Sequence, residues 1–282
     1  MKRVLRWIGL GFAAVATLVV FLGLGAFAAS EAMIRWPHAK PPVLIARATD
    51  PGAVARGRRL ATVAGCHDCH GEDFSGKLFH DEPAIIRAWA PNLTLAVAQQ
   101  SDAELDRAIR HGVAADGRTL WVMPSEAFAQ LSDAEAADLL AYLRSFAPKG
   151  VTQPHIQVGP VGRVGVLLGK FDSAPTALEK AAGRRPADLG AELAQGRSLA
   201  RACVECHGAD LKGGGATGAP DLTIAGAYDP EDFEKLLRTG MAAGNRKLGL
   251  MTQIAPVRFN AWSREEIGAL HAYLKARAAQ AS

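Results

Sequence analysis

The residues of this sequence best suited to chemistry are its four cysteines, which form two pairs, each followed at once by a histidine. In a C-x-x-C-H motif the thiols stand about one helical turn apart, a spacing that suits thioether bonds to the two vinyl groups of haem. The adjacent histidine can then bind the iron from the proximal side. The sequence predicts two covalently bound haem c groups, held by Cys66, Cys69, Cys203 and Cys206, with His70 and His207 as iron ligands.

A zinc site and a redox dithiol are the alternative interpretations of paired cysteines. A zinc site would more naturally join the two C-x-x-C units through short loops. A redox dithiol does not need the following histidine and usually lies near a βαβ pattern, which this sequence lacks. The two motifs use all four cysteines, so none remains for a structural disulfide. The pattern therefore favours haem attachment.

The other side of each iron needs a sixth ligand, for which methionine and histidine are the usual residues. Aligning Gly112 with Gly240 without a gap places Met123 opposite Met251, and both precede the last helix expected in their half. An isolated methionine more often fills a core, but two at one repeat position predict axial ligands at Met123 and Met251. Surface or packing roles are expected for three other histidines, His80, His111 and His271.

A proline follows each motif in a matched Ala-Pro-Asn/Asp-Leu segment, at Pro91 and Pro220. A backbone carbonyl at such a position could accept a hydrogen bond from the ring N–H of His70 or His207, which would fix the ring and raise its basicity. A simple loop proline is the alternative. Because the segment occurs after both motifs, the sequence favours Pro91 and Pro220 as the residues that orient the histidines.

The two halves of the chain repeat one helical plan. A serine with a glutamate three residues later marks a capping box at Ser101, Ser132 and Ser263. We predict an all-α fold of two tandem domains, at residues 41–148 and 189–282, joined by a Gly-, Pro- and Val-rich linker at 149–188 that is either flexible or draped over the seam. The expected helices are Val54–Ala64, Ser101–Gly112 and one from Ser132, then Ala191–Ala202, Asp229–Gly240 and one from Ser263.

Residues 1–40 contain an uncharged run, Trp7 to Ser30, that follows Lys2, Arg3 and Arg6. About 20 apolar residues cross a bilayer as a helix, and a basic start stays in the cytoplasm. A cleaved signal peptide is the alternative, because Ala26-Phe27-Ala28 fits a cleavage site. We expect a single-pass anchor in the bacterial cytoplasmic membrane, with the remaining residues facing the periplasm. An anchor and a cleaved signal peptide would both export the residues that follow.

The net charge of +4 is spread unevenly along the chain. Residues 1–40 carry +4, residues 41–148 carry −4, residues 149–188 carry +3 and residues 189–282 carry +1. No Lys/Arg-rich stripe with interleaved aromatic residues occurs, so no nucleic-acid partner is expected. The unequal charges of the two predicted domains suggest two different docking partners, because charge steers encounter.

These features resemble the class I c-type cytochromes, over most of residues 50–148 and 189–282. The order of the copies, the linker and the anchor look like the cytochrome c subunits of membrane-bound bacterial alcohol, gluconate and related dehydrogenases. Those relatives commonly carry three haems, and an aromatic residue is frequent where this chain has Leu60 and Leu199. The resemblance rests on Cys66–His70, Ala90–Leu93, Met123-Pro124 and Leu139–Leu143, then on Cys203–His207, Met251 and Tyr273.

The resemblance implies electron transfer. The expected role is a dihaem carrier that relays single electrons from a dehydrogenase or quinol-linked donor to a respiratory acceptor, such as a terminal oxidase or a soluble cytochrome. With a methionine on each iron both centres would be six-coordinate and closed to substrate, so no catalytic residue is expected. The alternative is a dihaem redox enzyme, such as a peroxidase or a sulfur-compound dehydrogenase, which requires an open iron position or a cysteine ligand.

Overall fold

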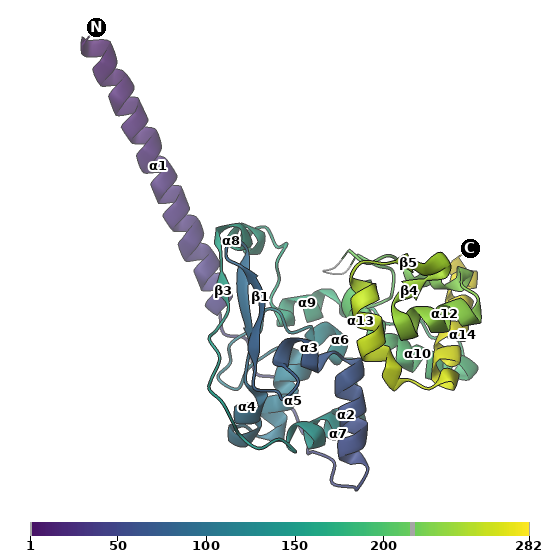
Figure 1. The fold of residues 1–282 in the computed structure, drawn as a ribbon. Coiled ribbons are helices and arrows are strands. Elements are labelled where there is room, and N and C mark those ends of the chain that lie inside the picture. Colours follow the sequence, from purple (N-terminus) through teal and green to yellow (C-terminus); the bar gives the residue numbers. More distant parts are fainter. Residues whose placement is uncertain (1, 215–217, 282) are drawn as a thin grey trace.

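The structure is a computed structural model that describes residues 2–214 and 218–281, most of which are helical. Figure 1 shows a long helix, α1 (Lys2–Arg35), projecting from two helical bodies that lie side by side. We call the body formed by residues 53–143 the first unit and the body formed by residues 191–281 the second unit. Each unit carries one of the two C-x-x-C-H motifs.

The first unit is built on α2 (Ala53–Val63), which packs across α7 (Asp133–Leu143). The motif forms the short helix α3 (Cys66–His70), directly after α2. Apolar residues of these helices and of the connecting segments form one core, which includes Phe74, Leu140 and Tyr142. The other helices of this unit are α4 (Leu93–Gln99), α5 (Asp102–His111) and α6 (Ser125–Phe128).

The second unit repeats this arrangement with α10 (Ala194–Ala200) packed on α14 (Arg264–Ala281). Its motif spans the 3-10 turn η2 (Arg201–Cys203) and the helix α11 (Val204–His207). The remaining elements are η1 (Ala191–Leu193), η3 (Leu222–Ala227), α12 (Pro230–Thr239), β4 (Met241–Ala242), η4 (Ala243–Asn245), β5 (Arg246–Lys247), α13 (Leu250–Arg258) and η5 (Phe259–Ala261).

The helices begin and end at the signals in the sequence. Gly112 and Gly240 end α5 and α12 in the left-handed conformation, with φ of 67° and 72°, which glycine adopts at little steric cost. Three helices begin with a capping box of a serine and a glutamate. The serine hydroxyl accepts a hydrogen bond from the glutamate backbone N–H, and the glutamate carboxylate accepts one from the serine backbone N–H. The pairs are Ser101 with Glu104, Ser132 with Glu135 and Ser263 with Glu266.

In both units the crossing of the two main helices depends on a glycine. A Cβ added at Gly57 would lie 2.0 Å from the carbonyl oxygen of Asp138 on α7. A Cβ added at Gly196 would lie 2.2 Å from the carbonyl oxygen of Ala269 on α14. Such contacts are far inside van der Waals distance, so each helix pair can pack this closely only with glycine at the crossing point.

We predict that Gly57→Ala and Gly196→Ala each lower the free energy of unfolding, by roughly the ~1–3 kcal/mol typical of overpacked cores. Gly268→Ala is the matched control, because it lies on α14 and nothing is within 4 Å of its added Cβ. That change should stabilise by ~0.5–1 kcal/mol, as alanine does in a helix. Urea titration followed by circular dichroism measures all three. Wild-type stability in both crossing variants would contradict the packing described here.

A small β-sheet in the first unit was not predicted, although the fold is mostly helical as expected. Strand β1 (Lys77–Glu82) pairs antiparallel with β2 (Ile86–Ala90), and β3 (Gln157–Val158) adds to the other edge of β2. The hairpin is inserted between the first motif and Pro91. The second copy has no room for it, because His207 and Pro220 are 13 residues apart whereas His70 and Pro91 are 21 apart.

The segment between the units, residues 149–188, is folded onto the first unit. Besides β3 it contains α8 (Pro160–Leu167) and α9 (Ala174–Lys180). Helix α8 is held against the tip of the hairpin, where the backbone N–H of Val161 donates to the carbonyl of Ala84 at 2.9 Å. The segment was expected to be either flexible or draped over the seam between the domains; its β3 and α8 are instead docked on the hairpin of the first unit.

Helix α1 has the length and composition of a membrane span. Its most apolar window has a mean hydropathy of 2.3, and none of that window is buried against the protein. The end of α1 contacts the first unit, where the indole N–H of Trp121 donates to the carbonyl of Ile34 at 3.1 Å. The apolar part of α1 therefore projects away from both units, as Figure 1 shows.

The two units meet in an interface that includes both apolar and charged residues. Val63 and Ala127 of the first unit complete the core of the second. The guanidinium of Arg59 donates to the carbonyl of Ala261 at 2.9 Å. A cavity of about 270 Å³ remains at this interface, and Leu60 and Leu199 both line it. Leu60 and Leu199, the two positions at which the resemblance implies an aromatic residue, thus lie at the same seam.

Candidate haem-binding sites

The first motif is positioned by a sharp turn at the end of α2. Gly65 has a φ of 68°, which lets the chain leave α2 and begin α3 at once. Cys66 and Cys69 therefore stand one turn apart on the same short helix, and both side chains are half-buried. In the second unit η2 leads directly into α11 without a glycine, and Gly208 ends the motif with a φ of 81°.

In both units the motif histidine is oriented by the proline carbonyl of the loop that follows. His70 Nδ1 lies 3.0 Å from the carbonyl oxygen of Pro91, and His207 Nδ1 lies 2.8 Å from that of Pro220. Because a carbonyl only accepts, Nδ1 must carry the proton, and Nε2 is the nitrogen left to bind iron. Burial lowers the pKa of both histidines, so the neutral rings that iron requires are favoured.

Each proline carbonyl is held in place by the residue that follows the proline. The side chain of Asn92 accepts hydrogen bonds from the start of α4, and its amide donates to the carbonyl of Lys149 at 2.7 Å. The corresponding Asp221 caps η3 and accepts a hydrogen bond from Arg277 at 2.7 Å. The Asn/Asp of the matched segments therefore fixes the loop, and the loop fixes the histidine.

A second matched pair, Phe74 and Leu211, was not predicted from the sequence. Each stands four residues after the motif histidine with a positive φ, 58° and 65°, which is uncommon for a bulky residue. Both side chains are fully buried, at 1% and 0% exposure. Each carbonyl accepts the backbone N–H of the leucine of the proline loop, at 2.9 and 3.0 Å. The strained backbone thus ties the motif to the loop that orients its histidine.

The thiols are poorly suited to redox chemistry of their own. Burial raises the pKa of Cys66 and Cys203 to about 12 and that of Cys69 to about 11. A redox dithiol requires a thiol that ionises easily, and these would stay protonated at neutral pH. In residues 2–214 and 218–281 no three His, Cys, Asp or Glu side chains gather in a metal-binding cluster, so the side chains described do not form a zinc-type site.

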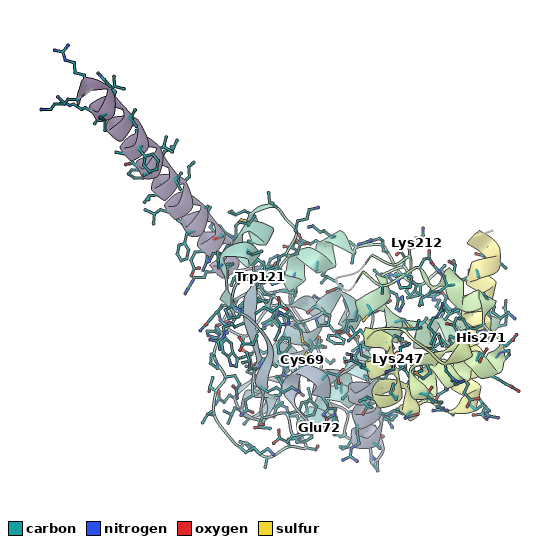
Figure 2. All side chains as sticks on the ribbon, turned by 45° about the horizontal axis from the view of Figure 1, so that its top comes forward. Cys69, Glu72, Trp121, Lys212, Lys247 and His271 are labelled. Atoms are coloured by element: carbon teal, nitrogen blue, oxygen red, sulfur yellow. The ribbon has the colours of Figure 1, made fainter. Side chains whose placement is uncertain are left out.

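The donor set fits haem c. In each unit two thiols and one imidazole extend from a single short helical segment, and the second ring nitrogen is already used by a carbonyl. Thioether attachment needs two cysteines at this spacing, and a single available imidazole nitrogen gives one axial bond. Figure 2 shows Cys69 in the middle of the molecule, so the first motif lies toward the seam between the units.

The two candidate methionines lie at matched places but in different local structure. Met123 is half-buried in the segment between α5 and α6, directly before Pro124. Met251 lies in the first turn of α13 and packs against the core of the second unit. The sequence predicts only that Met251 precedes the last helix, and the structure places it in a helix of its own, α13. The role of Met123 and Met251 as iron ligands stays a prediction.

The other histidines occupy varied environments. His80 is exposed on β1 and lies 3.7 Å from Glu82. His271 is buried on α14, stacked on Phe233 with ring centroids 4.6 Å apart. Figure 2 shows His271 on the far side of the second unit from Cys69. The remaining motif histidine, His67, packs on Phe74 with ring centroids 4.4 Å apart. His80 thus lies on the surface, whereas His67 and His271 pack against aromatic rings.

Arg258, which belongs to no motif of the sequence, joins the two C-x-x-C-H motifs. Its Nε donates to Asp68 of the first motif at 2.8 Å, and its Nη1 donates to Glu205 of the second at 2.7 Å. The Arg258 side chain is only 8% exposed. Its guanidinium also fills the space beside Gly65, where an added Cβ would lie 2.1 Å from it. Asp68 and Glu205 hold the same place in their motifs, so the bridge connects equivalent points of the two sites.

The sequence profile of the cytochrome c family matches residues 54–147 and 193–278. The cytochrome subunit of fructose dehydrogenase from Gluconobacter japonicus is 25% identical over 81% of this chain and 53% of its own length. The cytochrome c subunit of alcohol dehydrogenase (quinone) from Gluconacetobacter polyoxogenes is 24% identical over 80% and 56%. The gluconate 2-dehydrogenase cytochrome c subunit from Pantoea cypripedii is 26% identical over 80% and 60%.

The chain thus spans between 53% and 60% of the length of these curated relatives. Both C-x-x-C-H segments, with the proline loops that orient their histidines, lie inside the two stretches matched by the family profile. The profile and the geometry lead to one conclusion: this chain belongs to the cytochrome c family, and the group that its motifs serve is covalently bound haem c.

Proposed function

We propose that this chain is a membrane-anchored dihaem cytochrome c that relays single electrons from a dehydrogenase or quinol-linked donor to a respiratory acceptor. The observation that carries the proposal is the repeated attachment geometry, with an imidazole oriented by a proline carbonyl in each unit. A chain that holds two such sites against each other across one buried arginine is suited to passing electrons between them.

In this proposal each unit holds one haem through its own residues. Two cysteines of each motif supply the thioether sulfurs, and His70 and His207 supply one axial nitrogen each. When bound, the haems supply centres that gain and lose one electron. Met123 and Met251 supply the second axial ligands and close both iron positions, which suits a carrier and disfavours an enzyme that must bind its substrate at iron.

The organisation of the chain follows from these roles. Residues 41–148 and 189–282 are proposed as the two haem domains, residues 149–188 as their connection and residues 1–40 as the anchor. Helix α1 is long and apolar enough to cross a bilayer. Lys2, Arg3 and Arg6 would remain on the cytoplasmic side of the bacterial membrane, which sets the haem domains in the periplasm.

The proposed partners are a dehydrogenase on one side and a terminal oxidase or soluble cytochrome on the other. Three of the similar proteins are named as cytochrome subunits of fructose, alcohol and gluconate dehydrogenases, which supports a partner of that class. The proposed domains carry charges of −4 and +1. Unequal charges favour two different docking surfaces, since charge complementarity raises the rate of encounter.

A reduction experiment tests this proposal. The chain is extracted in mild detergent, the proteins that co-purify are identified, and reduction of its haems by the purified partner is followed by stopped flow. We expect a dehydrogenase among those proteins and a reduction rate that changes with salt, because screening weakens charge steering. A partner that reduces the haems at the same rate at every ionic strength would contradict docking by charge, and catalytic turnover of peroxide by the chain alone would favour the enzyme alternative.

A further inference from the structure

Exposed apolar side chains outside α1 concentrate on one short helix, α8. Val161, Val164 and Leu168 are 59%, 53% and 67% exposed, and they stand on one face at three- and four-residue spacing. The opposite face is buried, with Val166 at 1% exposure. Helix α8 therefore buries Val166 on one side and exposes a second apolar face on the other. The first unit does not cover this second face.

The location of α8 indicates what covers this face. The guanidinium of Arg163 on α8 donates to Ser30 Oγ at 3.0 Å and to Glu31 at 2.6 Å, and it lies 4.0 Å over the ring centroid of Phe27. Phe27 and Ser30 lie in the last turn of the apolar run of α1, and Glu31 directly follows that run. Figure 1 shows α8 at the end of the first unit from which α1 projects.

The contact fixes the depth of α8 if α1 crosses a bilayer. Ser30 and Glu31 mark the point where the apolar run ends, so they lie at the headgroup region, and Phe27 lies about 5 Å deeper at ~1.5 Å per residue. Any helix that touches all three must lie at the same level. Apolar side chains of a surface helix enter a membrane by ~5–10 Å at this level, while basic groups remain at the headgroups.

The helix is also held too firmly to turn its apolar face away. The backbone N–H of Gly159 donates to the carbonyl of Ile85 at 2.8 Å, and a Cβ added at Gly162 would lie 2.1 Å from that carbonyl oxygen. Ile85 itself is 41% exposed and extends the apolar surface onto the hairpin tip. Lys170, just beyond the helix, is exposed and can meet lipid phosphates.

We propose that the face of α8 formed by Val161, Val164 and Leu168, together with Ile85, is a lipid-contact surface that seats the first unit on the bilayer in one orientation. The inference rests on the proposed function, because it requires α1 to be a membrane anchor. It goes further, because it adds a direct contact between the first unit and lipid to the hold that α1 alone provides. The hairpin of β1 and β2, which is inserted between the first motif and Pro91, then serves to brace the membrane-contact helix.

Photo-crosslinking in intact membranes tests this surface. The full haem-loaded chain is produced with p-benzoylphenylalanine in place of Val164, in place of Val20 within α1, or in place of Val257, which is 60% exposed on the second unit. After irradiation, mass spectrometry of the labelled peptides identifies lipid or protein adducts. We expect lipid adducts at positions 164 and 20 and none at position 257.

Each other outcome has a distinct meaning. Lipid adducts at position 20 without any at position 164 would overturn the lipid-contact surface and leave the anchor intact. Protein adducts at position 164, to a partner or to a second copy, would overturn it in favour of a protein interface. Lipid adducts at neither position 164 nor position 20 would show that α1 does not cross the membrane, and the anchoring proposal itself would fail.

Discussion

Replacing Arg258 by glutamine is expected to loosen the two units and to slow electron exchange between their haems. Arg258 is the single cation between Asp68 and Glu205 in the described interface of the two motifs, and its side chain is 8% exposed. Removing it leaves two carboxylates beside each other without a cation between them. Asp68 and Glu205 are 36% and 31% exposed, so water compensates part of the lost charge. The cost should therefore lie between the ~0–1 kcal/mol of an exposed pair and the ~3–5 kcal/mol of a fully buried one, and the fixed separation of the haems should loosen.

Arg201→Gln is the matched control for Arg258→Gln. Arg201 also crosses the interface, where it pairs with Glu135 at 2.6 Å, but the Arg201 side chain is 22% exposed, compared with 8% for Arg258. The carboxylates of the two bridges are similarly exposed, so the variants differ mainly in the burial of the arginine. Exposed pairs contribute ~0–1 kcal/mol. Urea denaturation and flash reduction of one haem, followed at the other, measure stability and exchange. If Arg258→Gln lost no more than Arg201→Gln on both measures, the bridging role would be wrong.

A rescue variant separates charge from packing at this bridge. Adding Asp68→Asn and Glu205→Gln to Arg258→Gln removes the uncompensated carboxylates while keeping side chains of similar size. If burial of unpaired charge causes the loss, the triple variant should recover much of the stability. A triple variant as unstable as Arg258→Gln alone would show that the arginine acts mainly through its packing against Gly65.

Replacing Met123 or Met251 by alanine is expected to open one iron to external ligands. Neither alanine can coordinate, so the reduced variant should bind carbon monoxide at one haem, whereas the wild-type protein should bind it poorly. The reduction potential of the altered haem should also fall, because an axial methionine raises it. Titration of the reduced protein with carbon monoxide, followed by absorbance, measures the number of open sites.

Met241→Ala is the control for the methionine variants. Met241 begins β4 and aligns with Val113 of the first copy, so no ligand role is expected for it. Its loss should leave carbon monoxide binding and both potentials unchanged. Wild-type protein that binds two equivalents of carbon monoxide would contradict axial ligation by methionine and would revive the enzyme interpretation.

The features that could be predicted from the sequence are local ones. The cysteine spacing, the capping boxes and the glycine helix ends depend on residues a few positions apart, and the structure contains all of them. The His70–Pro91 contact spans 21 residues, yet comparison of the two copies pointed to it because the proline recurs. Internal repetition thus replaced, in part, the information that an alignment would give.

The features that could not be predicted depend on contacts between distant segments. Arg258 and Asp68 are 190 residues apart, and no spacing rule connects a lone arginine on one helix to a motif in another unit. The hairpin has an alternating pattern too weak to stand out, since nearly all of β1 is exposed. The residues of β3 and α8 are held in place by contacts with that hairpin. The glycine- and proline-rich composition of the linker therefore did not predict either element.

The central claim is that one chain holds two covalently attached haems, each on its own motif. The most direct measurement is the absorbance of the purified, acid-extracted protein in alkaline pyridine, which counts covalently bound haem c per chain. We expect two for the wild-type chain, and one for either Cys66→Ala/Cys69→Ala or Cys203→Ala/Cys206→Ala. A wild-type chain without covalently bound haem would contradict this claim. So would a single haem that stays bound when either cysteine pair is replaced.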